Sequence, residues 1–254
     1  MRNFSCFLLI ILSFFLISSD SDSIGNDLDA LNQIAKANDL YRNKKYSKAT
    51  IIYKSLISSG YKNGYLFFNA GNAYFRQGKL GLAILHYQKA LKKLPRNQNI
   101  DANLRYAVMK TTDKILETQK PLLKEIIFWV DDFSMREFTL FLVIINFIFW
   151  STLFVKGLSK KKIWDNLLWL TGIILIWVLI STGAKIYIEI NFKSGVIMSH
   201  HVEVKSAQGN ENITLFELHE GAVVNLGDVS GDWVQLKIKD NEKGWAQKKE
   251  VNPI

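Results

Sequence analysis

The fold of the N-terminal half is decided by residues 65–95, which read YLFFNAGNAYFRQGKLGLAILHYQKALKKLP. Small residues such as Gly71 and Ala83 are expected where two helices cross at close range. Gly78 allows the chain to turn, and Pro95 ends the second helix because the residue before a proline is pushed out of the helical region. The full pattern occupies ten positions: Phe67, Ala70, Gly71, Tyr74, Gly78, Leu80, Ala83, Tyr87, Ala90 and Pro95. These spacings predict a hairpin of two α-helices.

The same pattern recurs upstream at a constant interval. Ala49 precedes Ala83 by the same number of positions as Tyr53 precedes Tyr87. This interval and the two-helix unit are those of the tetratricopeptide repeat, which the stretch resembles. The resemblance implies a scaffold that binds other proteins, and it implies nothing about catalysis. A generic helical hairpin is the alternative interpretation.

The neighbouring copies are less regular than the central one. The upstream copy has Ala37 and Lys44 where the central copy has Gly71 and Gly78. A third copy starts near Asn97, and no second helix is recognisable in it. We expect this third copy to be a capping helix, because terminal repeats are often atypical and about three units are needed for a stable stack.

Length and charge limit the possible classes of protein. The 254 residues carry a net charge of +9, and this length permits two modest domains. Residues 24–126 contain 18 Lys and Arg against 7 Asp and Glu, whereas residues 191–254 contain 7 against 9. The basic half lacks any nucleic-acid-binding signature, so we interpret it as a solvated basic surface. Cys6 is the one cysteine and lies in an apolar leader, so no disulfide or thiolate site is expected.

Three hydrophobic segments predict export and membrane insertion. Residues 1–23 resemble a secretory signal, with Arg2 before a short apolar run and small residues after it; an uncleaved anchor is the alternative. Residues 138–156 and 164–186 approach the length that crosses a bilayer. The four lysines within residues 156–162 place the intervening loop in the cytoplasm under the positive-inside rule. The alternative is a buried helical hairpin in a soluble domain.

The C-terminal residues change to short β-type runs separated by turn residues. The runs are 195–198, 202–205, 222–226, 233–238 and 244–246, which predicts a small barrel. The sequences Leu218-His-Glu-Gly221, Gly231-Asp-Trp233 and Gly244-Trp245 resemble those of bacterial SH3-like domains. Such domains often bind peptides or cell-wall fragments, although we expect the two tryptophans to cover the barrel core instead.

The expected fold class is therefore a multidomain membrane protein with an all-α tetratricopeptide repeat solenoid, a two-helix transmembrane hairpin and a small all-β SH3-like barrel. The expected segments are a signal peptide (1–23), the repeat domain (24–120), an interfacial linker (121–137), transmembrane helices (138–156 and 164–186), a cytoplasmic loop (157–163) and the SH3-like domain (194–254).

This order of domains resembles the BatE proteins of the bacterial aerotolerance (Bat) operon. The stretch from Gly71 to Tyr87, Pro95 and the run from Asn103 to Ala107 carry the resemblance. It implies an inner-membrane protein whose soluble domains face the periplasm, with a role in stress tolerance. The implied partners are von Willebrand A-domain membrane proteins of the same operon and, indirectly, a MoxR-type ATPase.

No pattern for catalysis or for a cofactor is recognisable. The sequence has no phosphate-binding glycine loop, no G-x-S-x-G motif and no HExxH motif. His200 and His201 are adjacent, and adjacent residues of a strand point to opposite faces, so the pair is not expected to share a metal ion. His86 and His219 are isolated in sequence. We therefore expect no enzyme activity, no cofactor and no metal site.

The first helix of each hairpin is expected to line a concave groove. Amides, aromatics and cations recur there at the repeat period, and they could bind an extended acidic peptide. The candidate groove residues are Asn38, Tyr41, Arg42, Asn72, Phe75, Arg76 and Lys110. Asparagine is also common at this position in ordinary repeats, and that is the alternative interpretation.

Three functions compete on the sequence alone. The leading hypothesis is a membrane-anchored interaction scaffold in a periplasmic complex. The alternative is a cell-wall or peptide sensor that acts through the SH3-like domain. A wall hydrolase is the third, and no acid, base or nucleophile in the sequence supports it.

Overall fold

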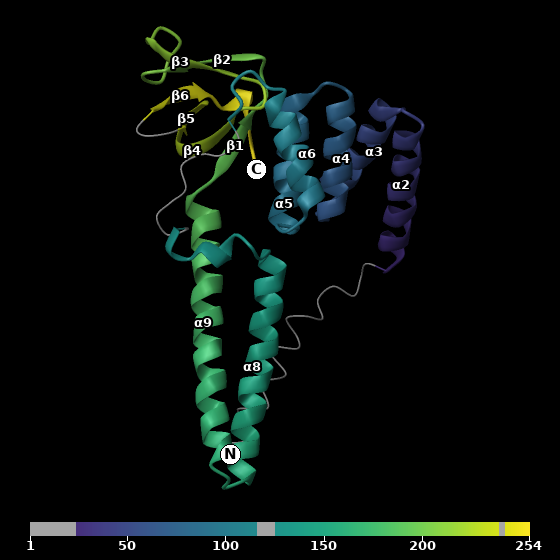
Figure 1. Ribbon diagram of the computed structural model, residues 1–254. Helices are drawn as coiled ribbons and strands as arrows, with labels where there is room; N and C mark the ends of the chain where they lie inside the picture. Colours follow the sequence, from purple (N-terminus) through teal and green to yellow (C-terminus); the bar gives the residue numbers. More distant parts are fainter. Residues whose placement is uncertain (1–23, 116–124, 239–241) are drawn as a thin grey trace. The chain divides into compact units, whose positions relative to one another are not determined.

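The computed structural model describes residues 24–115, 125–238 and 242–254 (Figure 1). The predicted signal peptide at residues 1–23 lies outside the described residues. The remainder divides into two compact units. One contains Ala30–Asp132 and Ile188–Ile254, and the other contains Phe133–Tyr187.

The N-terminal part is helical, as the repeat pattern predicts. Its helices are α2 (Ile24–Arg42), α3 (Tyr46–Ser58), α4 (Gly64–Arg76), α5 (Leu80–Lys93) and α6 (Gln98–Met109). The first four form two hairpins whose second helices, α3 and α5, begin one repeat period apart. Helix α6 follows, and the Asn97 side chain caps it by accepting hydrogen bonds from the backbone N–H groups of Asn99 and Ile100.

Small residues hold the helices of each hairpin close together. Ala49 and Ala83 are fully buried, and Tyr53 and Tyr87 are 1% exposed. A Cβ atom added to Gly71 would lie 2.7 Å from the Tyr87 ring, so only glycine fits there without a shift of the tyrosine. The structure confirms the expected helix crossing at Gly71 and Ala83.

The turn inside each hairpin uses a left-handed residue. Gly78 has φ +76°, and Lys44 takes the same place in the upstream hairpin with φ +59°. The two turns also share a hydrogen bond, because the N–H of Lys44 donates to Tyr41 and that of Gly78 donates to Phe75. Identical turns therefore form from different residues.

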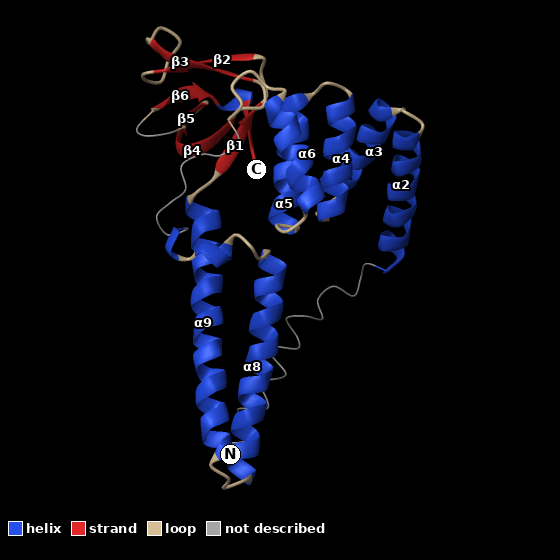
Figure 2. Ribbon diagram, viewed as in Figure 1, coloured by secondary structure: helices blue, strands red, loops and turns tan. Residues whose placement is uncertain are grey.

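Helices α8 (Met135–Leu158) and α9 (Ile163–Asn191) form a long apolar hairpin (Figure 2). Ser134 and Glu137 start α8 with a capping box, in which each side chain bonds the other residue's backbone N–H. Most of the apolar side chains of both helices are exposed. By length and composition both helices could cross a bilayer, and they cover the two predicted spans.

The C-terminal residues form one antiparallel sheet of seven strands (Figure 2). The strands are β1 (Ser194–Ile197), β2 (His201–Lys205), β3 (Thr214–His219), β4 (Val223–Ser230), β5 (Trp233–Lys237), β6 (Lys243–Gln247) and β7 (Val251–Pro253). Their spatial order is β3-β2-β6-β5-β4-β1-β7.

The described strands form an open antiparallel sheet where a small barrel was expected. Barrel closure requires the two outer strands to pair, and here β3 pairs with β2 while β7 pairs with β1. Strand β7 is only three residues long, and β1 also contacts helix α5. The sheet therefore covers part of its apolar surface with the repeat helices instead of closing on itself.

Two strands were not predicted, and one strand continues beyond the predicted run at 222–226. Strands β3 and β7 lie outside the five predicted runs. Gly227 and Asp228 lie within β4, where the register with β5 shifts between Leu226 and Val229. Such a shift marks a β-bulge rather than a turn.

The sheet docks on the end of the repeat stack (Figure 1). Val196 and Val223 are buried in the same hydrophobic cluster as the repeat helices. Gly221 has φ +91°, and a Cβ there would lie 2.5 Å from Thr111 and 2.8 Å from Ile84. This close approach requires glycine and joins residues more than one hundred positions apart in sequence.

Candidate functional site

The asparagines of the predicted groove bind neighbouring repeats to each other. The Asn38 amide oxygen accepts hydrogen bonds from the Tyr53 hydroxyl (2.7 Å) and from the Asn69 amide (3.0 Å). Each residue in this set has a counterpart one repeat period later in the chain. Each set ties the first helix of one hairpin to its own second helix and to the helix that follows the hairpin.

The second set is the same in kind and geometry. The Asn72 amide oxygen accepts from the Tyr87 hydroxyl (2.8 Å) and from the Asn103 amide (2.9 Å). Two donors use both lone pairs of the amide oxygen. The structure thus gives Asn38 and Asn72 a structural role, and their contact with a ligand stays a prediction.

The tyrosine hydroxyls of these two groups are protonated donors, and burial favours that form further. Burial raises the pKa of Tyr53 to about 12, with a smaller contribution from Tyr41 in the same direction. Burial also raises the pKa of Tyr87. Both hydroxyls therefore carry their protons at any physiological pH and can donate to the asparagines.

The predicted cations lie at the same end of successive first helices. Arg42 and Arg76 occupy the last turns of α2 and α4, and Lys110 is the C-terminal cap of α6. All three side chains belong to exposed residues. We call this set of Arg42, Arg76 and Lys110 the basic rim. Cations at helix C-termini also complement the helix dipole, which is a structural reason for the same pattern.

Aromatic rings lie beside the basic rim. The Arg76 guanidinium is 5.1 Å from the centre of the Tyr46 ring, and the Lys110 ammonium is 5.3 Å from that of Tyr106. The two aromatic residues of the predicted groove lie beside these pairs. The ring centres of Tyr41 and Tyr46 are 5.3 Å apart, and those of Phe75 and Tyr106 are 5.6 Å apart.

Arg42 differs from the other two members of the rim. Its guanidinium forms a solvent-exposed ion pair with Asp39, one turn earlier on the same helix. An acidic ligand at this position would replace Asp39 as the carboxylate partner of Arg42. A surface of cations stacked on aromatics can bind carboxylates by charge and extended chains by apolar contact.

A carboxylate of the sheet caps the second repeat. Helix α5 has no side-chain cap from its own N-terminal residue, Lys79. Instead the Glu220 carboxylate accepts a hydrogen bond of 2.9 Å from the backbone N–H of Gly81. A negative charge at a helix N-terminus is favourable, so this contact stabilises both the helix and the docking of the sheet.

A second polar contact between the repeat helices and the sheet involves a histidine. The Asp113 carboxylate accepts hydrogen bonds from the backbone N–H of His219 (2.6 Å) and from its ring Nδ1 (2.8 Å). Asp113 follows α6, and His219 is the last residue of β3. The sequence contained no local sign of this pair, which is separated by 106 residues.

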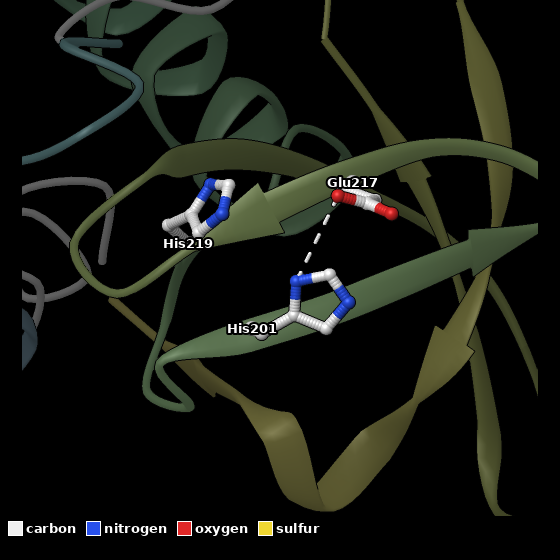
Figure 3. A group of neighbouring side chains, drawn as sticks. All are labelled: His201, Glu217 and His219. Atoms are coloured by element: carbon white, nitrogen blue, oxygen red, sulfur yellow. Dashed lines mark ion pairs between the residues drawn. The ribbon is translucent and has the colours of Figure 1, made fainter.

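His219 also lies beside His201, contrary to its isolation in sequence. The two residues are directly opposite each other in the β2–β3 pairing, and their ring centres are 5.7 Å apart. Glu217 lies on the same face, with a carboxylate oxygen 3.8 Å from Nδ1 of His201 (Figure 3). Within the described part of the chain, these three residues form the group that could hold a metal ion.

His200 and His201 have different neighbours in the structure. His200 precedes β2, its side chain is 97% exposed, and it faces Glu220 at 3.4 Å. The adjacent histidines therefore contact different carboxylates. His201 finds its partner on the neighbouring strand, and only a correct placement of β3 could have revealed that pairing.

Comparison with known proteins agrees with the repeat assignment. The tetratricopeptide repeat family matches residues 64–97, which cover α4, α5 and their flanking turns. A comparison with curated proteins finds no match. Residues 64–97 of this chain are thus a tetratricopeptide repeat, the type of unit that mediates contacts between proteins.

Proposed function

We propose that this chain is a non-enzymatic, membrane-anchored scaffold that binds other proteins through its tetratricopeptide repeats. The observation that carries the proposal is the repeat itself, matched at residues 64–97 and folded as stacked helical hairpins. The basic rim and its aromatic neighbours supply an exposed surface for an acidic, extended segment of a partner. The proposal needs no catalytic group.

The hairpin of α8 and α9 is proposed as the membrane anchor. Its apolar side chains are largely exposed, and such a surface is stable in hydrocarbon but not in water. The parts of the chain before and after the hairpin contact each other, since Gly81 bonds Glu220. They must then lie on the same side of the bilayer, which two crossings allow and one does not.

Charge supports one orientation for this anchor. The loop between the helices contains Lys160, Lys161 and Lys162, and Lys156 lies in the last turn of α8. Short loops rich in lysine stay in the cytoplasm. We therefore propose that the repeats and the sheet face the periplasm of a bacterial inner membrane.

The resemblance to BatE proteins extends the proposal to a complex. The proposed partners are the von Willebrand A-domain membrane proteins of the Bat operon, with a MoxR-type ATPase as an indirect partner. The proposed role is aerotolerance or the envelope stress response. The sheet is then a divergent SH3-like domain that covers the end of the repeat stack.

Capture of partners tests the proposal. The full-length chain is purified from its own cells in mild detergent, and co-purifying proteins are identified by mass spectrometry. The double variant Arg42→Ala with Arg76→Ala is the probe, and Lys48→Ala with Lys54→Ala on α3 is the control with the same loss of charge. The proposal expects membrane proteins with A-domains, captured by wild type and control and reduced in the probe.

Two outcomes would overturn parts of the proposal. Equal capture by the wild type, the probe and the control at low and high salt would show that the partner binds outside the basic rim. Retention of the pure protein on isolated peptidoglycan, without any co-purifying protein, would favour the cell-wall sensor instead.

A further inference from the structure

The exposed face of the β2–β3 hairpin presents metal-ligating side chains at one end. His201 and His219 are cross-strand partners, and Glu217 is two residues before His219, so the pleat directs all three to one side (Figure 3). One donor atom from each lies within 4.8 Å of the other two. The alternation of the strands places them together, while Val202 and Leu218 point into the core.

The contact with Asp113 prepares His219 to be a ligand. An ionised carboxylate only accepts hydrogen bonds, so the ring Nδ1 that lies 2.8 Å from Asp113 carries the hydrogen. The lone pair of the neutral ring is then on Nε2. Histidine ligands of zinc are commonly held by such a carboxylate, which fixes the tautomer and the orientation of the ring.

A neighbouring carboxylate on the same face is already paired with a lysine. Glu203 is opposite Glu217 in the strand pairing. A hydrogen bond from Lys205 lowers the pKa of Glu203, and the Thr214 hydroxyl lies 3.2 Å from the same carboxylate. These two donors occupy the Glu203 carboxylate, so it lies outside the proposed ligand set.

We propose that His201, Glu217 and His219 bind a Zn²⁺ ion, with Asp113 as a positioning residue. Two imidazoles and one carboxylate suit zinc, whereas Mg²⁺ and Ca²⁺ prefer oxygen ligands alone. With zinc–ligand bonds of about 2.0–2.1 Å, tetrahedral ligands lie about 3.3 Å apart. The exposed side chains of His201 and Glu217 can close the remaining distance by small rotations.

The proposed ion would strengthen the docking of the sheet. His219 is bonded through Asp113 to the segment that follows α6, so the ligand set is linked to the repeats. An ion that binds only the folded protein raises its stability. Three protein ligands leave a fourth position for water.

Zinc titration of the full-length protein tests this proposal. The protein is purified in detergent without a polyhistidine tag, in a Cys6→Ser background that removes the thiol, and is stripped with a chelator. Zinc affinity is measured by competition with a chromophoric chelator. One ion per chain is expected, together with a zinc-dependent rise in Tm.

Matched variants locate the ligands. His201→Gln, Glu217→Gln and His219→Gln should each lose the bound ion and the rise in Tm. Asp113→Asn should keep the stoichiometry and weaken binding by roughly 10–100-fold, as expected for a residue that holds a ligand. His200→Gln is the control and should bind as wild type does.

Each result decides the proposal. Circular dichroism and Tm without metal establish that every variant is folded. Absence of zinc binding in the folded wild type, or unchanged binding by the folded His219→Gln variant, overturns the site. An equal loss of zinc binding in the His200→Gln and His201→Gln variants overturns the assignment of the ligands.

Discussion

Lys44 and Gly78 adopt the same left-handed backbone conformation at equivalent turns, although only one of them is glycine. A residue with a Cβ costs roughly 1–2 kcal/mol in this conformation, and glycine avoids that cost while gaining entropy in the unfolded chain. The turn at Lys44 is therefore a place where the sequence is not optimal for its own fold.

Lys44→Gly should raise the free energy of unfolding by about 0.5–1 kcal/mol, because the lost strain outweighs the added entropy of the unfolded chain. Chemical denaturation of the full-length protein in detergent measures this change. Lys48→Gly is the control: Lys48 lies within helix α3, where glycine relieves no strain and should lower the stability. A destabilised Lys44→Gly protein would contradict the argument.

His86 makes the repeats sensitive to acid. Burial lowers its pKa to about 4, with the nearby Lys89 charge acting in the same direction, and its ring stacks on Tyr74 at 5.2 Å. Among the described residues, no hydrogen-bond partner contacts its buried Nδ1. The folded repeats therefore favour the neutral ring.

Stability should then fall as the pH falls from about 6.5 toward 4. In this range the unfolded chain binds a proton that the folded chain excludes, and the loss approaches roughly 3 kcal/mol at the lower end. His86→Phe should remove this part of the pH dependence, which denaturation at several pH values measures. An unchanged slope in the variant would show that other groups cause it.

At the scale of the elements, helix α5 depends on a residue that is remote in sequence. Its N-terminus is capped by Glu220, 139 residues away, and not by its own N-cap residue. Glu220→Ala should cost roughly 0.5–2 kcal/mol, the usual effect of losing a helix cap.

Glu220→Gln should retain most of that stability, because the amide oxygen can still accept from the Gly81 N–H while the charge is lost. Thermal unfolding of both variants measures the difference, and Glu211→Ala in an exposed loop serves as the control. Equal Tm values for Glu220→Ala and wild type would mean that the contact contributes nothing to the helix.

At the scale of the whole molecule, thiol reagents can test the proposed orientation of α8 and α9 in the membrane. In a Cys6→Ser background, a cysteine at position 161 should resist impermeant reagents in intact cells, because it lies in the cytoplasmic loop. A cysteine at position 210 should react once the outer layers are opened. Labelling in the reverse pattern would invert the orientation.

The helical repeats could be predicted because their signal is local. The register of the repeat, the crossing at Gly71 and the turn at Gly78 are all set by residues within one hairpin. The sets around Asn38 and Asn72 follow the same period, yet nothing in the sequence indicates that their oxygens bind the helix after the hairpin.

The sheet could be predicted only in outline, because its important contacts are remote in sequence. Strand β3 does not alternate cleanly between apolar and polar residues, and without it His219 could not be placed opposite His201. The docking on α5 depends on Glu220 and Gly221, whose partners in the repeats have no sequence pattern that pairs them.

The shared core of the repeats and the sheet also sets an order of events during synthesis. The Lys92 ammonium donates a hydrogen bond to the backbone carbonyl of Ile254, which is 162 positions further along the chain. At about 5–20 residues per second, a ribosome needs roughly ten to thirty seconds to make that interval. During this time the end of α5 lacks its contact with Ile254, and helices α8 and α9 must both be made before Ile254. The repeats thus reach their finished form only after the sheet has been made, and a chain that stops before the sheet would keep an uncovered apolar surface for quality-control proteases to recognise.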